Sequence, residues 1–337
     1  MTRMTDPLDA SPSRAHLGSW PTPLEPAPRL AAALGLDPED LWIKHDDLSG
    51  LGGGGNKVRK LEWTAGTALA HGADVLVTTG AAQSNHARLT AAAGAKLGLD
   101  VVLVLTGSPA PSGNIALDAL LGATIHWCGD VTEEELAARA EDVASALFDE
   151  GRTPALIPFG GSNALGATGY RDAGVELLAQ EPMVEHVVVA VGSGGTMAGL
   201  VVALGADRVL GIDTGALSDP VSAVAHMASE LSGNEQDTAT VQVDRSLLGP
   251  GYGSVTEEVL EALHLAARTE GMVLDPTYTA RAMAGLVRAC RDGRIRRGHR
   301  TVFWHTGGLP GLLGHQDALD QIVRSSVEQS DAHARTS

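Results

Sequence analysis

The stretch Gly52–Trp63, GGGGNKVRKLEW, decides how the rest of the sequence is interpreted. Its four consecutive glycines permit the positive φ angles that let a backbone turn sharply and approach a ligand. Apolar residues then recur at helical spacing at Val58, Leu61 and Ala65, which predicts an amphipathic helix that starts at or near Lys57. A lysine at a helix N-terminus lies among partial positive charges, and desolvation lowers its pKa further. Lys57 is therefore a candidate nucleophile toward a carbonyl, although this stretch alone is explained more simply by a surface loop and a solvated lysine.

The composition excludes several classes of protein. The 337 residues, 44% of them hydrophobic, are enough for one large domain or two ordinary ones. The net charge of −17 argues against nucleic acid and anionic membrane as partners. Cys128 and Cys290 lie far apart, so we expect neither a disulfide framework nor a metal site. The N-terminus has no apolar signal segment, which favours a soluble cytoplasmic protein.

Short apolar runs alternate with helical patterns along the chain. The first group predicts helices at 57–71, 87–97, 114–121 and 132–147, and strands at 75–78, 101–105, 124–127 and 155–157. The second group predicts helices at 165–178, 197–204, 221–231, 256–270, 279–290 and after 308, and strands at 41–44, 187–191, 209–212, 241–243 and 301–304. Continuous apolar strands separated by helices indicate βαβ units and parallel sheets.

Three further details complete this prediction. Thr132 with Glu135 three residues later is a capping box, which starts the last helix of the first group. Residues 20–30, WPTPLEPAPRL, are predicted to be extended, because a residue that precedes a proline is biased away from helix. The loop Gly160–Asn163 is the expected crossing between two α/β domains.

The loop Gly192–Thr196, GSGGT, lies directly between a strand pattern and a helix pattern. Its glycines expose successive backbone N–H groups, and the helix start adds its dipole, so the loop is suited to hold a phosphate. It is neither a Walker loop nor a full dinucleotide fingerprint, which has wider glycine spacing and a later ribose-binding acid. A tight strand-to-helix turn is the alternative, and the position of the loop favours the phosphate.

The loop Gln83–His86, QSNH, also lies between a strand and a helix. Ser84 or Asn85 either caps that helix, which is the more frequent role, or binds a carboxylate or a ring hydroxyl. Taken alone, His86 is more often structural than catalytic.

Two of the three tyrosines, Tyr252 and Tyr278, lie in the glycine- and proline-defined loops GYG and DPTYT. Each is either a core tyrosine with one hydrogen bond or a cleft residue that donates a proton or orients a substrate. The loop His305–Gly308, HTGG, follows a strand and is either another turn or part of the same site.

Taken together, these loops lie at strand ends in the order and spacing of one family. The chain resembles the D-cysteine desulfhydrase and 1-aminocyclopropane-1-carboxylate deaminase family of fold-type II enzymes, which use pyridoxal phosphate (PLP), over roughly residues 17–313. The matching segments are PTPLEPAPRL, IKHDDLSG, GGNKVRKLE, GAAQSNHARLTAAAGAKLGL, IPFGGSNALGATGY, VGSGGTMAGL, PGYG, EGMVLDPTYTARAMAGL and HTGG.

The resemblance implies an α/β fold of two open parallel-sheet domains with PLP in the cleft between them, similar to the β subunit of tryptophan synthase. We accordingly expect a large PLP-binding domain at 19–56 and 163–324 and a small α/β domain at 57–162. A loose N-terminal arm at 1–18 and a disordered tail at 325–337 complete the chain. The family also implies a homodimer.

The resemblance further implies roles for individual residues. Lys57 matches the lysine that holds the cofactor covalently, and Asn85 matches the asparagine that hydrogen-bonds its ring oxygen. Ser84 and its loop match the site of the substrate carboxylate, with Ser84 also a group that could transfer a proton. Tyr252 and Tyr278 match the two active-site tyrosines, and Gln83 belongs to the same substrate loop as Ser84. The phosphate cradle is matched by Gly192, Ser193, Gly194, Gly195 and Thr196.

Two positions separate the branches of this family. The deaminases carry a glutamate after the second tyrosine and a leucine after the histidine of the HxGG loop, whereas this chain has Thr279 and Thr306 and so matches the desulfhydrases. Thr279 is accordingly expected at the substrate and Thr306 at the cofactor. The resemblance therefore implies β-elimination of D-cysteine to pyruvate, ammonia and sulfide, with Lys57 removing the Cα proton and Tyr278 assisting the departing thiolate.

Several alternatives stay open at this stage. On the same scaffold, the chain could be a 1-aminocyclopropane-1-carboxylate deaminase, a cysteate sulfo-lyase or a racemase. The loop 105–114 is shorter than its counterpart in the family, which leaves the choice of amino-acid substrate open. A dinucleotide-dependent dehydrogenase with a structural Lys57 is a remote alternative, and a non-enzymatic binding module would make Lys57, Tyr252 and Tyr278 coincidental.

Overall fold

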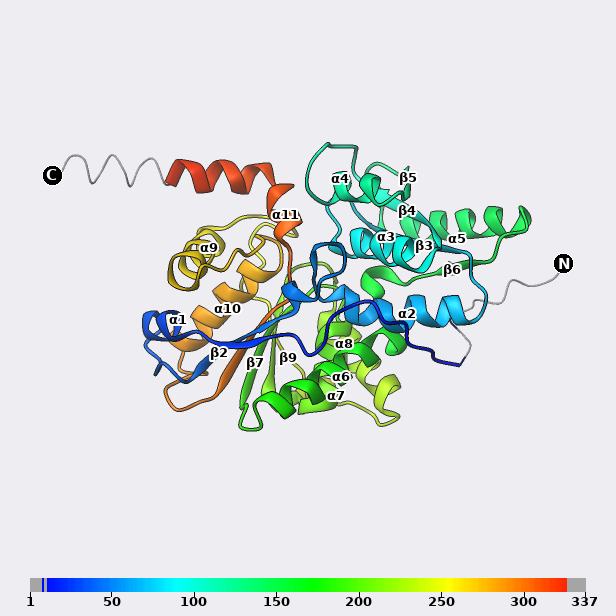
Figure 1. Cartoon of the computed structure of the whole chain (residues 1–337). Coiled ribbons are helices and arrows are strands. Elements are labelled where there is room, and N and C mark those ends of the chain that lie inside the picture. The colour runs from blue at the N-terminus through cyan, green and yellow to red at the C-terminus, as the bar shows by residue number, and fades with distance from the viewer. Residues whose placement is uncertain (1–7, 9–10, 326–337) are drawn as a thin grey trace.

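The computed structural model describes residue 8 and residues 11–325, which build two separate β-sheets with helices on both faces (Figure 1). The strand order is β1-β2-β10-β7-β8-β9 in the six-stranded sheet and β5-β4-β3-β6 in the four-stranded sheet. Every pairing is parallel except that of β1 with β2 at the edge of the larger sheet. The predicted α/β class with two open parallel sheets is therefore confirmed.

The six-stranded sheet is covered by three helices on each face. Its strands are β1 (Leu24–Pro26), β2 (Leu41–His45), β7 (His186–Val191), β8 (Val209–Asp213), β9 (Gln242–Asp244) and β10 (Thr301–His305). One face packs against α1 (Pro28–Ala33), α9 (Glu257–Glu270) and α10 (Thr279–Arg291), and the other against α6 (Ala164–Gln180), α7 (Gly195–Leu204) and α8 (Pro220–Ser232). Val188 faces the first group and Val187 and Val189 face the second, because successive strand residues point to opposite faces.

The four-stranded sheet repeats this arrangement on a smaller scale. Its strands are β3 (Val75–Ala81), β4 (Asp100–Thr106), β5 (Thr124–Trp127) and β6 (Pro154–Leu156). Leu76 packs against α2 (Lys57–Ala70) and α3 (Asn85–Leu97), whereas Val75 and Val77 pack against α5 (Glu133–Asp149). The short helix α4 (Gly113–Leu120) lies beside α3, and the predicted capping box of Thr132 and Glu135 begins α5.

The segment 20–30 differs from its prediction as an extended stretch. Residues Leu24–Pro26 do pair as β1, but α1 begins at Pro28, so Arg29 and Leu30 are helical. A proline is favourable in the first turn of a helix, because its φ is already helical and no N–H is needed there.

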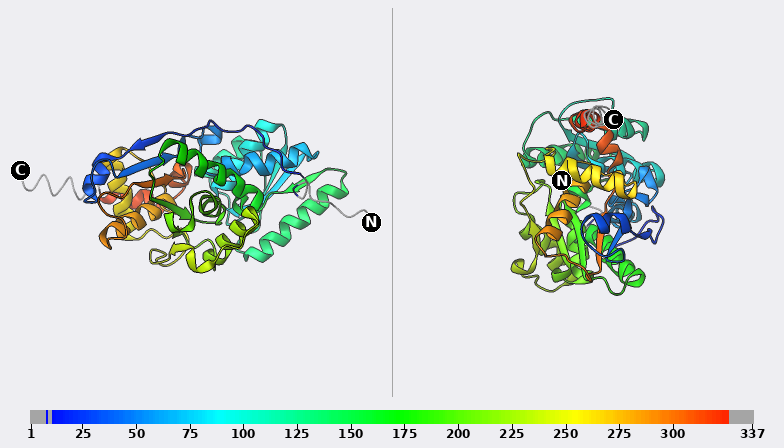
Figure 2. Two further views of the ribbon diagram at one scale, coloured as in Figure 1. Left: turned by 90° about the horizontal axis from the view of Figure 1, so that it is seen from below. Right: turned by 90° about the vertical axis from the view of Figure 1, so that its left-hand side faces the viewer.

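The N-terminal segment is bound to α2, so the prediction of a loose arm is wrong for residues 13–17. Ser13 N donates to Thr67 Oγ1 (2.9 Å), Ala15 N to Glu62 O (2.7 Å) and Leu17 N to Glu62 Oε1 (2.9 Å). Figures 1 and 2 show this dark blue segment running across both sheet units.

The C-terminal part of the described chain is helical, with α11 (Leu309–Leu313) followed by a helix over 316–325. The predicted tail therefore begins inside a helix, and its remainder, 326–337, lies outside the described residues, as do 1–7 and 9–10 of the arm. Among the described helices, none is both long enough and apolar enough to cross a membrane.

A buried ionic network joins α2 to the six-stranded sheet. Asp46 is fully buried and accepts hydrogen bonds from Arg59 Nε (3.1 Å) and Nη2 (3.0 Å), Trp304 Nε1 (2.8 Å) and the Tyr170 hydroxyl. Burial opposes ionisation of Asp46, but Arg59 and these donors outweigh it and hold the pKa of the carboxyl below its usual value. Arg59 also binds Glu176 (2.8 Å), so one guanidinium connects α2 to the end of β2 and to α6.

We predict that Asp46→Ala lowers the free energy of unfolding by about 3–5 kcal/mol, because it leaves the Arg59 charge partly uncompensated in the interior. The matched control is Arg294→Met, which breaks the exposed ion pair with Asp244 (2.7 Å) and should remove about 1 kcal/mol or less. Urea unfolding of the three proteins measures both values. Similar losses in the two variants would contradict a dominant role for the buried network.

Candidate active site

The glycine run is a packed connection between the two sheets rather than a surface loop. Residues 52–55 have φ values of 54°, 85°, 75° and 128°, all in the region that favours glycine. A Cβ on Gly54 would lie 1.8 Å from the Asp47 carbonyl oxygen. Gly55 N donates to Asp46 O and Asn56 N to Thr306 O, both at 2.9 Å, so the run passes between the ends of β2 and β10. The helix α2 begins at Lys57, as predicted.

A cavity opens where the carboxyl ends of strands from both sheets meet. This is where parallel α/β sheets bind ligands, because the loops that follow neighbouring strands converge there. The cavity is lined by Asn56, Lys57, Lys60, Ser84, Asn85, His86, Phe159, Gly160, Ala190, Gly192, Ser193, Gly194, Thr196, Ala216, Tyr278, Thr306 and Gly307. The fold thus brings together nine predicted residues: Lys57, Ser84, Asn85, Gly192, Ser193, Gly194, Thr196, Tyr278 and Thr306.

Two lysines line this cavity, and burial lowers the pKa of both. Desolvation lowers the pKa of Lys57 to about 8, against an opposing effect of the Asp275 carboxylate. Desolvation and then the neighbouring Lys57 lower the pKa of Lys60 well below its usual value. Lys60 Nζ donates to Ser162 Oγ (2.8 Å) and to Gly160 O (3.3 Å). Among the described residues that line the cavity, none is acidic, so the site is suited to an anionic ligand.

The GSGGT loop ends in the first turn of α7 and faces this cavity. Ser193 Oγ and Ser162 Oγ are hydrogen-bonded at 2.7 Å, and Asn56 Nδ2 donates to Thr196 Oγ1 (3.0 Å). The hydroxyls and the helix start form a cradle for a phosphate, with Lys60 one hydrogen bond behind it.

Gly195 is the one member of the predicted cradle that does not line the cavity. Its N–H donates to Ser162 Oγ (3.3 Å), and a Cβ there would lie 2.7 Å from the same oxygen. The glycine therefore allows Ser162 to approach the loop, which the sequence alone did not indicate.

Ser84 caps a helix and also lies at the cavity. Its hydroxyl caps α3 by accepting from Ala87 N (3.1 Å), and the residue also lines the cavity. Asn85 begins the helix, and its Oδ1 accepts from Asn114 Nδ2 (3.0 Å). His86 is bound through Nε2 to Thr78 Oγ1 (2.9 Å), and desolvation lowers its pKa, so it lies in the cavity wall as a neutral ring.

A second chamber adjoins the first and shares Asn85 and Tyr278 with it. The chamber is lined by Ala81, Gln83, Asn85, Tyr252, Gly253, Asp275, Thr277, Tyr278, Gly311 and His315. The two tyrosine hydroxyls are hydrogen-bonded at 2.5 Å. Burial raises the pKa of Tyr278 well above its usual value, with a further contribution from Tyr252, so the phenol keeps its proton at neutral pH. Tyr252 is 44% exposed, which places solvent beside the chamber.

Asp275 is a site residue that sequence reasoning missed. It is buried and accepts from the backbone N–H groups of Thr277 (3.0 Å), Tyr278 (2.9 Å) and Thr279 (3.0 Å). Burial nevertheless raises the pKa of this carboxyl. The signal in the sequence was an aspartate three residues before Tyr278, because short acidic side chains bind the backbone two or three residues onward.

Thr279 does not lie at the substrate as predicted. It is completely buried, its hydroxyl donates to Asp275 Oδ1 (2.8 Å), and it lines neither cavity. Thr279 therefore holds Asp275 in place, whereas Thr306 does face the first cavity. Lys60 was also missed, although its position three residues after Lys57 places both on one face of α2.

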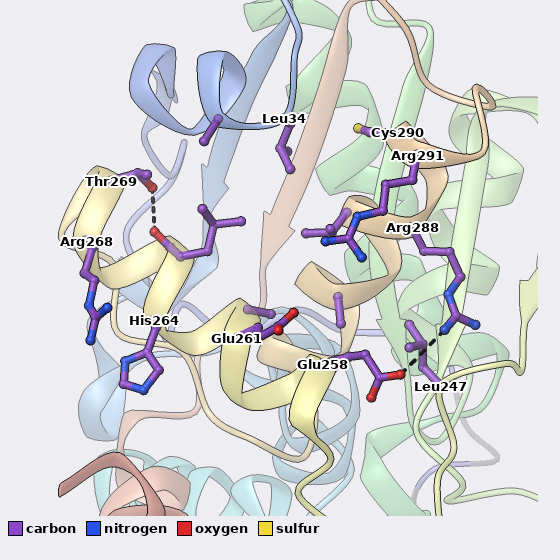
Figure 3. Close-up of a pocket in the computed structure, with 15 residues that line it drawn as sticks. Leu34, Leu247, Glu258, Glu261, His264, Arg268, Thr269, Arg288, Cys290 and Arg291 are labelled. Carbon is purple, nitrogen blue, oxygen red and sulfur yellow. Dashed lines mark hydrogen bonds and ion pairs between the residues drawn. The ribbon is translucent and has the colours of Figure 1, made fainter. Parts of the chain in front are cut away.

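A larger groove, of about 590 Å³, lies on the outer side of the six-stranded sheet between α1, α9 and α10 (Figure 3). Its polar residues form a mixed-charge surface in which Arg288 pairs with Glu258 at 3.9 Å. None of the predicted site residues lines it. The chemistry of the lining, and not the size of the cavity, thus identifies the candidate site.

Comparison with protein families identifies the family of the chain. A model of pyridoxal-phosphate-dependent enzymes matches residues 16–307. The chain belongs to this family. The residues present fit this group, because the GSGGT cradle would hold its phosphate and a lysine of the lining, such as Lys57, would bind its aldehyde. The dinucleotide-dependent dehydrogenase and the non-enzymatic module therefore lose their support.

Individual relatives cover nearly the whole of this PLP-dependent enzyme. Proteins of Pyrococcus horikoshii and Pyrococcus furiosus, both provisionally named 1-aminocyclopropane-1-carboxylate deaminase, are 39% and 37% identical over 319 and 318 residues. These alignments cover 92% and 91% of this chain and 96% and 95% of the relatives. A crystal structure described as an ACC deaminase homologue, 38% identical, superposes with a TM-score of 0.84 over 94% of this chain and 98% of that one.

A more distant structure shows the fold alone. The processed form of threonine deaminase isoform 2 from Solanum lycopersicum is 19% identical and superposes with a TM-score of 0.60, covering 85% of this chain and 78% of that one. The fold-type II architecture implied by the resemblance is therefore confirmed.

We predict that covalent capture of PLP follows a pH midpoint of about 8, because only neutral Lys57 is nucleophilic and its pKa is lowered to that value. Cofactor-free protein is mixed briefly with PLP at several pH values and reduced with borohydride, and the label is located by peptide mapping. Asp275→Asn should move the midpoint to lower pH, because it removes a carboxylate that stabilises the ammonium form. Lys57→Ala is the unlabelled control, and a midpoint near 10.5 would contradict the prediction.

Proposed function

We propose that this PLP-dependent enzyme is a lyase that eliminates the β-substituent of D-cysteine, or of a close β-substituted amino acid, to give pyruvate, ammonia and sulfide. The observation that carries the proposal is that Thr306 lines the proposed cofactor cavity and that no described residue of this lining is acidic. A carboxylate close to the pyridine nitrogen would favour the protonated ring and a strong electron sink. A weaker sink suits a β-elimination, where the leaving group removes the electrons early.

Lys57 is the proposed base. When bound, PLP supplies an acceptor for the electrons released at Cα of the amino acid. With a pKa of about 8, Lys57 Nζ has a substantial neutral fraction near neutral pH, so it can take the Cα proton. Lys57 begins α2 and lines the same cavity as Ser84 and the GSGGT loop.

Tyr278 is the proposed acid for the leaving group. Its phenol stays protonated at neutral pH, and the hydrogen bond to Tyr252 provides a path for replacing a transferred proton. Ser84, Asn85 and the loop amides are proposed to bind the substrate carboxylate. Gln83 lines the chamber, but its amide already bonds Ser112 O (3.2 Å) and Asn114 N (2.8 Å), so its proposed contribution is to hold the loop 105–114 near the substrate.

The second chamber supports a thiol substrate over a sulfonate one. None of the described residues that line it is a lysine or arginine. His315 donates from Nε2 to Gly253 O (2.8 Å) and accepts at Nδ1 from Ala318 N (3.3 Å), which is the pattern of a neutral ring. A sulfonate there would find no countercharge in the described lining, so cysteate is disfavoured. A 1-aminocyclopropane-1-carboxylate deaminase is the second candidate, because the names of two relatives point to it.

We predict that the protein releases sulfide and pyruvate from D-cysteine, and that Lys57→Ala lowers this rate by a factor on the order of 10³, as expected for loss of a general base. A parallel panel with 1-aminocyclopropane-1-carboxylate and cysteate, read as 2-oxobutyrate and sulfite, tests the alternatives. Rapid 2-oxobutyrate release without sulfide would replace the proposal by the deaminase. Unchanged sulfide release in Lys57→Ala would reject Lys57 as the base.

We predict that Tyr278→Phe slows turnover of D-cysteine by roughly 10²-fold and that of β-chloro-D-alanine much less, because chloride leaves without a proton. The comparison of two leaving groups separates acid catalysis from a general loss of fold. Tyr252→Phe is the matched variant, expected to have the smaller effect. If the selectivity appeared only in Tyr252→Phe, the acid role would belong to Tyr252.

We further propose, on the family resemblance alone, that the protein is a cytoplasmic homodimer. Analytical ultracentrifugation tests the assembly, and a monomer at micromolar concentration would reject it.

A further inference from the structure

Arg88 is a completely buried arginine that bonds only backbone carbonyls among the described residues. It lies in the first turn of α3 and donates from Nη1 to Gly52 O and from Nη2 to Gly54 O (3.2 Å). Both carbonyls belong to the glycine run that leads to Lys57. Arg88 therefore connects the loop that carries Ser84 and Asn85 to the loop that carries Lys57.

Arg281 has a similar arrangement in the other half of the site, although it also donates to the Ser254 hydroxyl (3.4 Å) and to Thr214 O (3.5 Å). It is completely buried in the first turn of α10, and it donates from Nη1 to Leu248 O (3.0 Å) and from Nη2 to Ser254 O (2.8 Å) and Gly251 O (3.4 Å). These carbonyls surround Tyr252. Arg281 thus connects the helix that follows Tyr278 to the loop that carries Tyr252.

These two guanidinium groups are poorly compensated. In the described part of the chain neither forms an ion pair with a carboxylate, and the Nε atom of each has no hydrogen-bond partner. Burial accordingly lowers the pKa of Arg88 to about 10 and that of Arg281 below its usual value. A buried charge of this kind is a poor source of stability, because apolar residues of similar volume often stabilise a fold as well or better.

The segments that the arginines bind are rich in glycine, the residue whose backbone has the greatest conformational freedom. Gly52 and Gly54 have positive φ, as do Gly249, Gly251 and Gly253 beside Tyr252. Glycine loses more conformational freedom on folding than other residues, so such loops need external contacts to keep one conformation. In both cases the contact is a planar fork of N–H donors that binds two or more carbonyls at once.

Residues of helix α4 interact with Arg88 and with the neighbouring Asn85. Asn114 binds Asn85, and Asp118, four residues later on the same helix face, is completely buried with no hydrogen-bond partner. Arg88 and Asp118 interact electrostatically, which favours the charged form of both. One face of α4 thereby supports the two loops on that side of the cavity.

We propose that Arg88 and Arg281 are paired positioning residues, of which Arg88 sets the position of Lys57 and Arg281 that of Tyr252. The inference rests on the roles proposed for Lys57 and Tyr252. It assigns separate effects to the two arginines: Arg88 controls how the cofactor is held, and Arg281 controls how the amino acid is held.

The test compares Arg88→Met and Arg281→Met in the PLP-loaded protein, with each variant as the control for the other. Hydrogen exchange is followed in peptides that cover residues 50–57 and 247–254. Dissociation constants are measured for PLP and for D-alanine, an amino acid without a leaving group, from the visible absorbance. Arg88→Met should speed exchange only in 50–57 and weaken PLP binding about tenfold or more. Arg281→Met should speed exchange only in 247–254, weaken D-alanine binding to a similar extent and leave PLP binding within about twofold.

Arg88→Lys and Arg281→Lys keep the charge and one donor group, so each should recover part of the effect at its own site. They also serve where a methionine variant does not fold. Lower thermal stability with both exchange rates and both dissociation constants unchanged would overturn the proposal, as would identical effects of the two variants. If borohydride labels a lysine other than Lys57 in the unmodified protein, the proposed function fails, whereas the exchange data still decide whether the arginines hold their loops.

Discussion

The bond between Arg59 and Asp46 is the contact on which the geometry of the site depends. Arg59 lies two residues after Lys57, and Asp46 follows β2 directly, with Tyr170 of α6 and Trp304 of β10 on the same carboxylate. The first turn of α2 is thereby attached to the six-stranded sheet, while the remainder of the helix packs on the four-stranded sheet. A lysine that belongs to one sheet therefore faces a phosphate cradle that belongs to the other.

Charge is distributed between the two adjoining cavities in a way that matches their proposed occupants. Lys57 and Lys60 line the first cavity without an acidic neighbour in its lining, which suits a phosphate-bearing cofactor. Asp275 lies in the second chamber, close enough to raise the pKa of Lys57 against desolvation. The lysine amine is thereby kept between full protonation and full neutrality, as a nucleophile that later acts as a base requires.

Local patterns predicted most of the fold because strands and helices have different periods and the loops between them are marked by glycine and capping residues. The helix start at Lys57, the capping box of Thr132 and the positive φ of the glycine run were all predicted correctly. The arm at residues 13–17 was not, because its order comes from Glu62 and Thr67, some fifty residues away. The start of α1 was missed because the bias of residues that precede prolines was extended to Pro28 itself, which is favourable in the first turn of a helix.

The sequence by itself determined most of the elements and the α/β class, and it marked GSGGT as a candidate phosphate loop and Lys57 as a candidate nucleophile. Only the tertiary structure decided that Thr306 faces the cofactor cavity while Thr279 holds Asp275, that Gly195 makes room for Ser162, and that two buried arginines anchor the glycine loops. The physical reason is that burial, desolvation and hydrogen-bond partners are set by contacts between distant segments. The glycine run shows both contributions, because its composition permits the turn, whereas Arg88, Asp46 and Thr306 select the one conformation that presents Lys57 to the cavity.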